Sequence, residues 1–210
     1  ACKTDTVVFD KTGTLTLGLT DGAEQLRPGA AEAVRALKDR GMELWMISGD
    51  KREKAERISG MLGIENVLCE VRPADKSDAV KALQARGKHV CFIGDGINDS
   101  PALSAADVGI AINSGAAIAR EIADVTIKAD SLEELVILKT IANSLQRRVS
   151  ANYRFVLTFN SALIALGAMG ILQPASSAML HNLSTIGISL KSMTNLIPEE
   201  KAQKALAEKN

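Results

Sequence analysis

The stretch "VVFDKTGTLTLG" at residues 7–18 decides the fold, because a short apolar run ends there in an acidic residue, Asp10. A short apolar run bounded by turn-forming residues is typical of a buried strand. Taken alone, an Asp in this place most often serves a turn or caps a helix. The lysine, glycine and threonines behind it raise the question of a chemical role, and the rest of the chain answers it.

The N-terminal part of the chain alternates apolar runs with helical stretches. The apolar runs are 6–10, 42–48, 66–70, 88–94, 107–112 and 124–128. Leu, Ala and Val recur at three- and four-residue spacing in 29–41, 51–63, 74–87 and 97–106. This alternation predicts an α/β fold, Rossmann-like, whose parallel sheet has helices on both faces. Ligands of such sheets bind at the carboxyl ends of the strands, so we expect Asp10, Ser48 and Asp95 on one rim.

The composition excludes some classes of protein. Lys and Arg total 25, as do Asp and Glu, and aromatic residues make up 3 % of the chain. We therefore expect no nucleic acid among the partners, since there is neither a basic excess nor a base-stacking platform. The three cysteines form no CxxC pair, which indicates a reducing compartment.

Residues 150–198 are predicted to form a hydrophobic helical hairpin, between a domain at 1–149 and a charged cytoplasmic tail at 199–210. The run 155–172 has no charged residue, and 175–190 has none if His181 is neutral. Because about 20 apolar residues span a bilayer, we expect membrane insertion rather than a pair of buried helices. Basic residues at both outer ends favour cytoplasmic ends.

Four polar residues of this hairpin have two interpretations. They are either contacts for a transported ion or hydrogen-bonding links between the two helices. The four are Asn160, His181, Asn182 and Ser184.

The segments at the rim together indicate phosphoryl transfer. Ser48 and Gly49 in "ISGD" offer a hydroxyl and a bare amide to phosphoryl oxygens. Lys76 in "RPADK" can neutralise a phosphate, and Asp95 and Asp99 in "GDGINDSP" are typical of Mg²⁺ ligands or of residues that support them. Asp10 would then attack phosphorus and form an acyl phosphate, with Mg²⁺ and Lys76 stabilising the charge.

The residues behind Asp10 complete this hypothesis. Lys11 is expected to act mainly through its charge, and Thr12 to offer its carbonyl oxygen to the metal. Gly13 permits a close approach, and Thr14 can donate a hydrogen bond to a phosphate oxygen.

Four motifs, in order, resemble those of one family. "DKTGTLT" (10–16) resembles the phosphorylation motif of P-type ATPases, within the haloacid-dehalogenase superfamily. "SGD" (48–50) is similar to the family's TGD, "PADK" (73–76) to its P-x-D-K, and "GDGINDSP" (94–101) to its GDGxNDxP. The stretches 26–50 and 152–193 resemble the heavy-metal pumps in particular, the second of them their last two membrane helices.

The resemblance implies a role for each matching residue. Asp10 is the phosphorylated nucleophile, and Lys76, Ser48 and Asp99 are the other catalytic residues. Mg²⁺ is held by Asp10, Asp95 and the carbonyl of Thr12. The phosphate-binding set is Lys11, Thr12, Gly13, Thr14, Gly49, Asp50 and Asn98. The resemblance also implies a membrane protein whose phosphorylation domain is cytoplasmic.

One interval departs from the family. The pumps carry a nucleotide-binding domain after DKTGTLT, where this chain has the nine residues 17–25. We therefore expect the phosphoryl-transfer core of a truncated or split heavy-metal pump, with a second subunit supplying the missing domains. The donor would be ATP in a complete pump and small acyl phosphates for this chain alone.

Two alternatives remain open. One is a stand-alone phosphatase of the haloacid-dehalogenase type with a membrane anchor. The other is a non-catalytic regulatory partner of a full pump, against which the intact set of Asp10, Lys76 and Asp95 argues.

Overall fold

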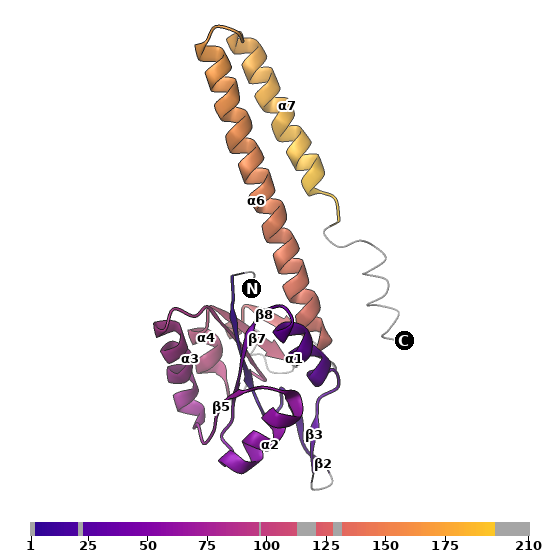
Figure 1. Ribbon diagram of the computed structural model, residues 1–210, viewed down its shortest axis with the longest axis vertical. Helices are drawn as coiled ribbons and strands as arrows, with labels where there is room; N and C mark the ends of the chain where they lie inside the picture. Colours follow the sequence, from indigo (N-terminus) through magenta and orange to yellow (C-terminus); the bar gives the residue numbers. More distant parts are fainter. Residues whose placement is uncertain (1–2, 21–22, 97, 113–120, 128–131, 196–210) are drawn as a thin grey trace. The chain divides into compact units, whose positions relative to one another are not determined.

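The structure is a computed structural model that describes residues 3–20, 23–96, 98–112, 121–127 and 132–195 (Figure 1). The predicted tail 199–210 lies outside these residues. The chain divides into two compact units, residues 1–139 and 140–210, whereas the sequence suggested a boundary at 149. Helix α6 (Glu133–Ala168) contributes its first turns to the first unit and the remainder to the second.

A six-stranded sheet forms the centre of the first unit. Its strands are β1 (Thr6–Asp10), β4 (Glu43–Ile47), β5 (Asn66–Leu68), β6 (Val90–Gly94), β7 (Val108–Ile112) and β8 (Val125–Ile127). The order is β5-β4-β1-β6-β7-β8, and every neighbouring pair is parallel. All six predicted strands are confirmed. The chain order reverses between β1 and β6, which is the place where open α/β sheets bind ligands.

Helices cover both faces of this sheet, as the sequence predicted. Helices α1 (Ala30–Lys38) and α2 (Arg52–Leu62) pack on one face, and α3 (Lys76–Ala85) and α4 (Ser100–Ala105) on the other (Figure 1). Because side chains alternate along a strand, the neighbours Val8 and Phe9 of β1 enter different cores, and both are fully buried. Each such side chain contributes about 1.5–3 kcal/mol by its burial, so β1, and Asp10 at its end, is held from both sides.

A short hairpin occupies the interval after the DKTGTLT motif. Strands β2 (Thr16–Thr20) and β3 (Ala23–Leu26) pair antiparallel and form a separate two-stranded sheet. The sequence analysis predicted no element there. The hairpin joins the end of the Asp10 loop to α1.

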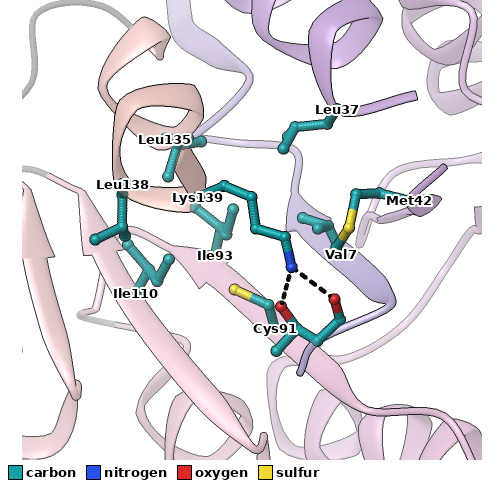
Figure 2. A pocket seen from close by; sticks show the side chains of 10 residues that line it. Val7, Leu37, Met42, Cys91, Ile93, Ile110, Leu135, Leu138 and Lys139 are labelled. Carbon is teal, nitrogen blue, oxygen red and sulfur yellow. Dashed lines mark hydrogen bonds between the residues drawn. The ribbon is translucent and has the colours of Figure 1, made fainter. Parts of the chain in front are cut away.

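The first turns of α6 pack over a small cavity in the sheet's α1 side (Figure 2). Its volume is about 30 Å³, which is room for roughly one water molecule. Lys139 reaches across it, and its Nζ donates to the carbonyl oxygen of Thr4 at 2.8 Å. Cys91 forms part of the wall, and burial raises the pKa of its thiol to about 12, so this cysteine is a packing residue.

The second unit is a helical hairpin formed by α6 and α7 (Pro174–Ser192). Asn152 Nδ2 donates to Ser192 Oγ at 2.9 Å, and the guanidinium of Arg148 donates to the carbonyl oxygens of Ser192 and Asn195 at 3.2 and 3.0 Å. These contacts fix the end of α7 against α6. The predicted hairpin is therefore present as a pair of helices.

The predicted membrane crossing is not supported by these helices. Within the described ranges, neither α6, α7 nor any other helix combines the length and the hydropathy that a span requires. The reason lies in the helix bounds. Helix α6 ends at Ala168, so only 155–168 of the uncharged run is helical, about 21 Å at 1.5 Å per residue. Polar residues interrupt α7 throughout its length.

Candidate active site

Three residues distant in sequence meet at the carboxyl end of the sheet. Asp10 ends β1, Lys76 begins α3, and Asp99 precedes α4. Lys76 Nζ lies 2.6 Å from Asp10 Oδ1 and 2.6 Å from Asp99 Oδ1. All three side chains are buried, with at most 8 % of each exposed. The ammonium group thus bridges two carboxylates at the rim that the sequence predicted.

Burial dominates the electrostatics of this cluster. Burial, and next the charge of Asp99, raise the pKa of Asp10 to about 6, although Lys76 acts in the opposite direction. The pKa of the Asp99 carboxyl is also raised, again chiefly by burial. Burial would lower the pKa of Lys76, but the two carboxylates more than offset this and raise it. The lysine therefore stays cationic between two acids, of which Asp10 retains its proton unusually well.

Gly13 and Asp95 lie against each other on the same rim. Gly13 has φ +76°, and a Cβ added to it would lie 3.1 Å from Asp95 Oδ2. A side chain at Gly13 would therefore be strained by the positive φ and would make a tight contact with the Asp95 carboxylate. The Asp95 carboxylate thus lies against the backbone of Gly13, the residue after Thr12. The backbone amide of Asp95 donates to Asp99 Oδ2 at 3.3 Å.

The hydroxyl of Thr14 is buried, and no hydrogen-bond partner for it is found in the described part of the chain. An unsatisfied buried polar group costs about 1–3 kcal/mol. A buried hydroxyl of this kind in the loop that follows Asp10 fits a site built to receive a polar ligand.

The carboxylates at the rim fit Mg²⁺. Within the ranges that the structure describes, no three His, Cys, Asp or Glu residues are grouped so as to hold a metal by themselves. Mg²⁺ needs no such group, because it commonly takes one or two carboxylates together with phosphate oxygens and water. Asp10 and Asp95 can supply the two carboxylates.

Lys11, expected at a phosphate, contacts two carboxylates. Its Nζ forms ion pairs with Glu24 of β3 and with Asp50. Burial would lower the pKa of Lys11, but the hydrogen bonds with Asp50 and Glu24 outweigh burial and raise it. Lys11 in turn lowers the pKa of the Asp50 carboxyl.

The remaining predicted residues of the rim lie on its loops. Ser48 is buried, and its hydroxyl accepts from the backbone amide of Asp50 at 3.1 Å. Thr12, Gly49 and Asn98 are exposed. The end of β1 and the loops after β1, β4 and β6 therefore carry the predicted residues of the rim, apart from Lys76, which begins α3.

The four polar residues of the hairpin belong to the second unit. His181 Nδ1 lies 2.9 Å from Asn160 Oδ1, which links α7 to α6. Ser184 Oγ donates to the carbonyl of His181 at 2.7 Å, while Asn182 is exposed. The contacts of His181, Asn160 and Ser184 lie within the hairpin itself.

Sequence reasoning missed two residues that contact the Asp10 loop. Glu24 pairs with Lys11, and Arg27 donates from Nε to the Thr14 carbonyl at 2.8 Å and from a terminal nitrogen to the Gly13 carbonyl at 2.6 Å. One signal was available. An Asp-Gly dipeptide at 21–22 is typical of a hairpin turn, and a hairpin there brings residues 24–27 back toward residues 11–16.

Comparisons with known proteins agree with this geometry. Residues 17–107 match the model of the haloacid dehalogenase-like hydrolase family. The zinc-exporting P-type ATPase of Mycobacterium marinum is 38 % identical over 84 % of this chain, and the probable copper-importing P-type ATPase A of Enterococcus hirae is 34 % identical over 90 %. The crystal structure of a zinc-transporting PIB-type ATPase in the E2.Pi state superposes with a TM-score of 0.74, at 28 % identity over 80 % of this chain.

The chain spans about a quarter of the length of these relatives, 24 % and 26 % of the two ATPases and 27 % of the solved structure. The family match includes β4, β5 and β6 of the sheet. The chain is therefore similar over 17–107 to the haloacid dehalogenase-like hydrolases, and over most of its length to one part of the heavy-metal P-type ATPases.

Proposed function

We propose that this chain is the Mg²⁺-dependent phosphoryl-transfer core of a heavy-metal P-type ATPase, and that it forms an aspartyl phosphate at Asp10. The observation that carries the proposal is the buried cluster in which Lys76 bridges Asp10 and Asp99 at 2.6 Å each. Burial of two acids around one lysine is costly, and a purely structural site gains little from it. Strongly perturbed carboxylates at a sheet's ligand-binding edge indicate function.

The chemistry follows from the positions of these groups. A carboxylate oxygen of Asp10 attacks phosphorus, a new O–P bond forms, and the bond to the donor's leaving oxygen breaks with its electron pair. With acetyl phosphate the leaving group is acetate, which needs no proton from the protein. Lys76 neutralises charge at the nucleophile, and the unpartnered Thr14 hydroxyl is available to a phosphoryl oxygen. Mg²⁺ held by Asp10, Asp95 and the Thr12 carbonyl would screen the donor's charge from the carboxylates.

The wider setting of the pump is also a proposal. The relatives named above are a zinc-exporting P-type ATPase and a probable copper-importing one, which supports a heavy-metal cation as cargo and ATP as the donor in a complete pump. A second subunit would supply a nucleotide-binding domain. The apolar side chains exposed on α6 and α7, Ile164 and Leu183 among them, support association of the hairpin with lipid.

A second candidate is a stand-alone phosphatase, and the β2–β3 hairpin favours it. The chain resembles the heavy-metal pumps, and the β2–β3 hairpin stands at the position where those pumps carry the nucleotide-binding domain. The rim would then be complete for chemistry but would hold only the phosphate end of a nucleotide.

Trapping of the phosphoenzyme tests both candidates. Wild-type protein incubated with Mg²⁺ and radioactive acetyl phosphate is expected to retain acid-stable label that hydroxylamine releases, and Asp10→Asn to retain none. Saturable labelling from ATP supports the pump core, whereas turnover of small donors with weak, non-saturating use of ATP supports the phosphatase. Labelling of Asp10→Asn at the wild-type level contradicts the assignment of the nucleophile.

A further inference from the structure

The return strand of the hairpin contacts the Asp10 loop at two points. Glu24, on β3, reaches Lys11, and Arg27, directly after β3, reaches the carbonyls of Gly13 and Thr14. A backbone bond adds to them, because the amide of Arg27 donates to the Leu15 carbonyl at 2.8 Å. The loop that carries the nucleophile is thus held along its length by residues that the established motifs do not include.

The ammonium group of Lys11 is enclosed by protein. Its side chain is only 3 % exposed, and it lies between the carboxylates of Glu24 and Asp50. Glu24 is itself held, since Thr16 Oγ1 donates to its Oε1 at 3.0 Å, and Ser48 Oγ donates to Asp50 Oδ2 at 3.3 Å. Two fixed carboxylates around one ammonium leave a net negative charge, which disfavours a phosphate at Lys11.

Arg27 fixes the orientation of two peptide groups. Two nitrogens of its guanidinium group donate hydrogen bonds to the carbonyl oxygens of neighbouring residues. A lysine, with a single nitrogen, cannot reproduce this arrangement. A peptide group is planar, with its N–H directed opposite to its C=O. Holding the Gly13 carbonyl toward Arg27 therefore aims the Thr14 amide away from Arg27, and the two bonds together fix the peptide groups on both sides of Thr14.

We propose that Glu24 and Arg27 are positioning residues for the nucleophile loop, and that Lys11 links the hairpin to the rim instead of binding phosphate. The inference rests on the proposed function of Asp10 as nucleophile. The hairpin thereby sets the geometry of phosphoryl transfer without contacting the donor.

Kinetics with p-nitrophenyl phosphate and Mg²⁺ test the proposal. Glu24→Gln keeps an oxygen for Thr16 but removes the charge opposite Lys11, and Arg27→Lys keeps the charge but loses the fork. Both are expected to lower kcat by about 10- to 100-fold, the scale of a small misplacement of reacting groups, with KM within about twofold of wild type. The matched control is Glu65→Gln, which removes the exposed ion pair of Glu65 with Lys38 at 2.6 Å and should change neither constant.

The split between kcat and KM separates positioning from phosphate binding. If Lys11 binds the donor, Glu24→Gln frees its ammonium group and KM falls severalfold while kcat is kept. That result overturns the inference. So does unchanged kcat in both variants of an active enzyme.

Amide hydrogen exchange gives a readout that needs no activity. The amides of Leu15 and Thr16 both donate to the Lys11 carbonyl at 3.0 Å, so they report the closure of the loop. We expect these two amides to exchange at least about fivefold faster in Glu24→Gln and Arg27→Lys than in wild type or in the control Glu65→Gln. The loss of one hydrogen bond would permit a larger increase in the exchange rate than this. If wild-type protein turns over no donor, the proposed function fails, and unchanged exchange in the variants would then overturn the positioning role separately.

Discussion

The buried carboxylate of Asp10, which the proposed chemistry needs, lowers the stability of the folded chain. Its pKa is raised from 3.8 to about 6 in the folded chain. Between these values the folded chain holds a proton that the unfolded chain has lost, so the free energy of unfolding falls as pH rises through this range. Above about pH 6 the full cost is present, up to about 3 kcal/mol on the scale of 1.36 kcal/mol per pKa unit.

Asp10→Asn should therefore stabilise the metal-free protein. At pH 8 in EDTA we expect its free energy of unfolding to exceed that of wild type by about 1–3 kcal/mol, because the neutral amide carries no buried charge. At pH 5 only about half of the difference should remain, since Asp10 is then protonated in the folded chain but still ionised in the unfolded chain. Urea unfolding at the two pH values measures this. A wild type more stable than the variant at pH 8 would show that the pair with Lys76 outweighs burial.

At the scale of elements, the end of β6 leaves no room for a side chain. A Cβ on Gly94 would lie 2.4 Å from Asp99 Oδ2 and 2.9 Å from Asp99 Cβ. Alanine there must push Asp99, and with it the contact to Lys76. We expect Gly94→Ala to cost about 1–3 kcal/mol of stability and to reduce phosphoenzyme formation.

Gly60→Ala is the matched control for this change. Gly60 lies within α2, and an added Cβ meets nothing within 4 Å. Alanine favours a helix over glycine, so the free energy of unfolding should rise by about 0.4–1 kcal/mol with labelling unchanged. If Gly94→Ala and Gly60→Ala lose equal amounts of thermal stability and of phosphoenzyme label, then the close contact between Gly94 and Asp99 has no special role.

The elements also show what the sequence could predict. The six strands were predictable because each is an apolar run between turn signals, and the rim followed because parallel strands place their carboxyl ends together. The hairpin was not predicted, since its strands are short and lie outside the alternation. The partner of Lys11 was missed for the same reason, because only the Asp-Gly pair at 21–22 signals the turn that brings Glu24 back to Lys11.

At the scale of the whole molecule, the first unit includes the beginning of α6. Leu132 and Leu135 are buried in the core with β1 and α1. The helical hairpin was predictable as two helices from its length and composition. Its membrane crossing stays a prediction: an uncharged run does not reveal that α6 ends at Ala168, and no helix in the described part of the chain is long and apolar enough for a span.

Residues 1–149 should accordingly fold without the rest of the chain. This piece keeps Leu132, Leu135 and Lys139 in place but removes most of the apolar side chains exposed on α6 and α7. We expect a monomer on size-exclusion chromatography with the near-ultraviolet circular dichroism of a packed core around Trp45. Aggregation of 1–149 alongside a monodisperse full-length chain would show that the hairpin shields the sheet instead of adding an apolar surface of its own.

The antiparallel pairing of β2 with β3 has a consequence for engineering. Because the two strands hold each other, the points where the chain enters and leaves the turn stay adjacent whatever joins them, and lengthening a connection adds little closure entropy. The β2–β3 pair is therefore a suitable insertion site. A foreign folded module with neighbouring termini can be inserted between β2 and β3. A change in the distance between the termini of that module would then pull on β3, the strand that carries Glu24.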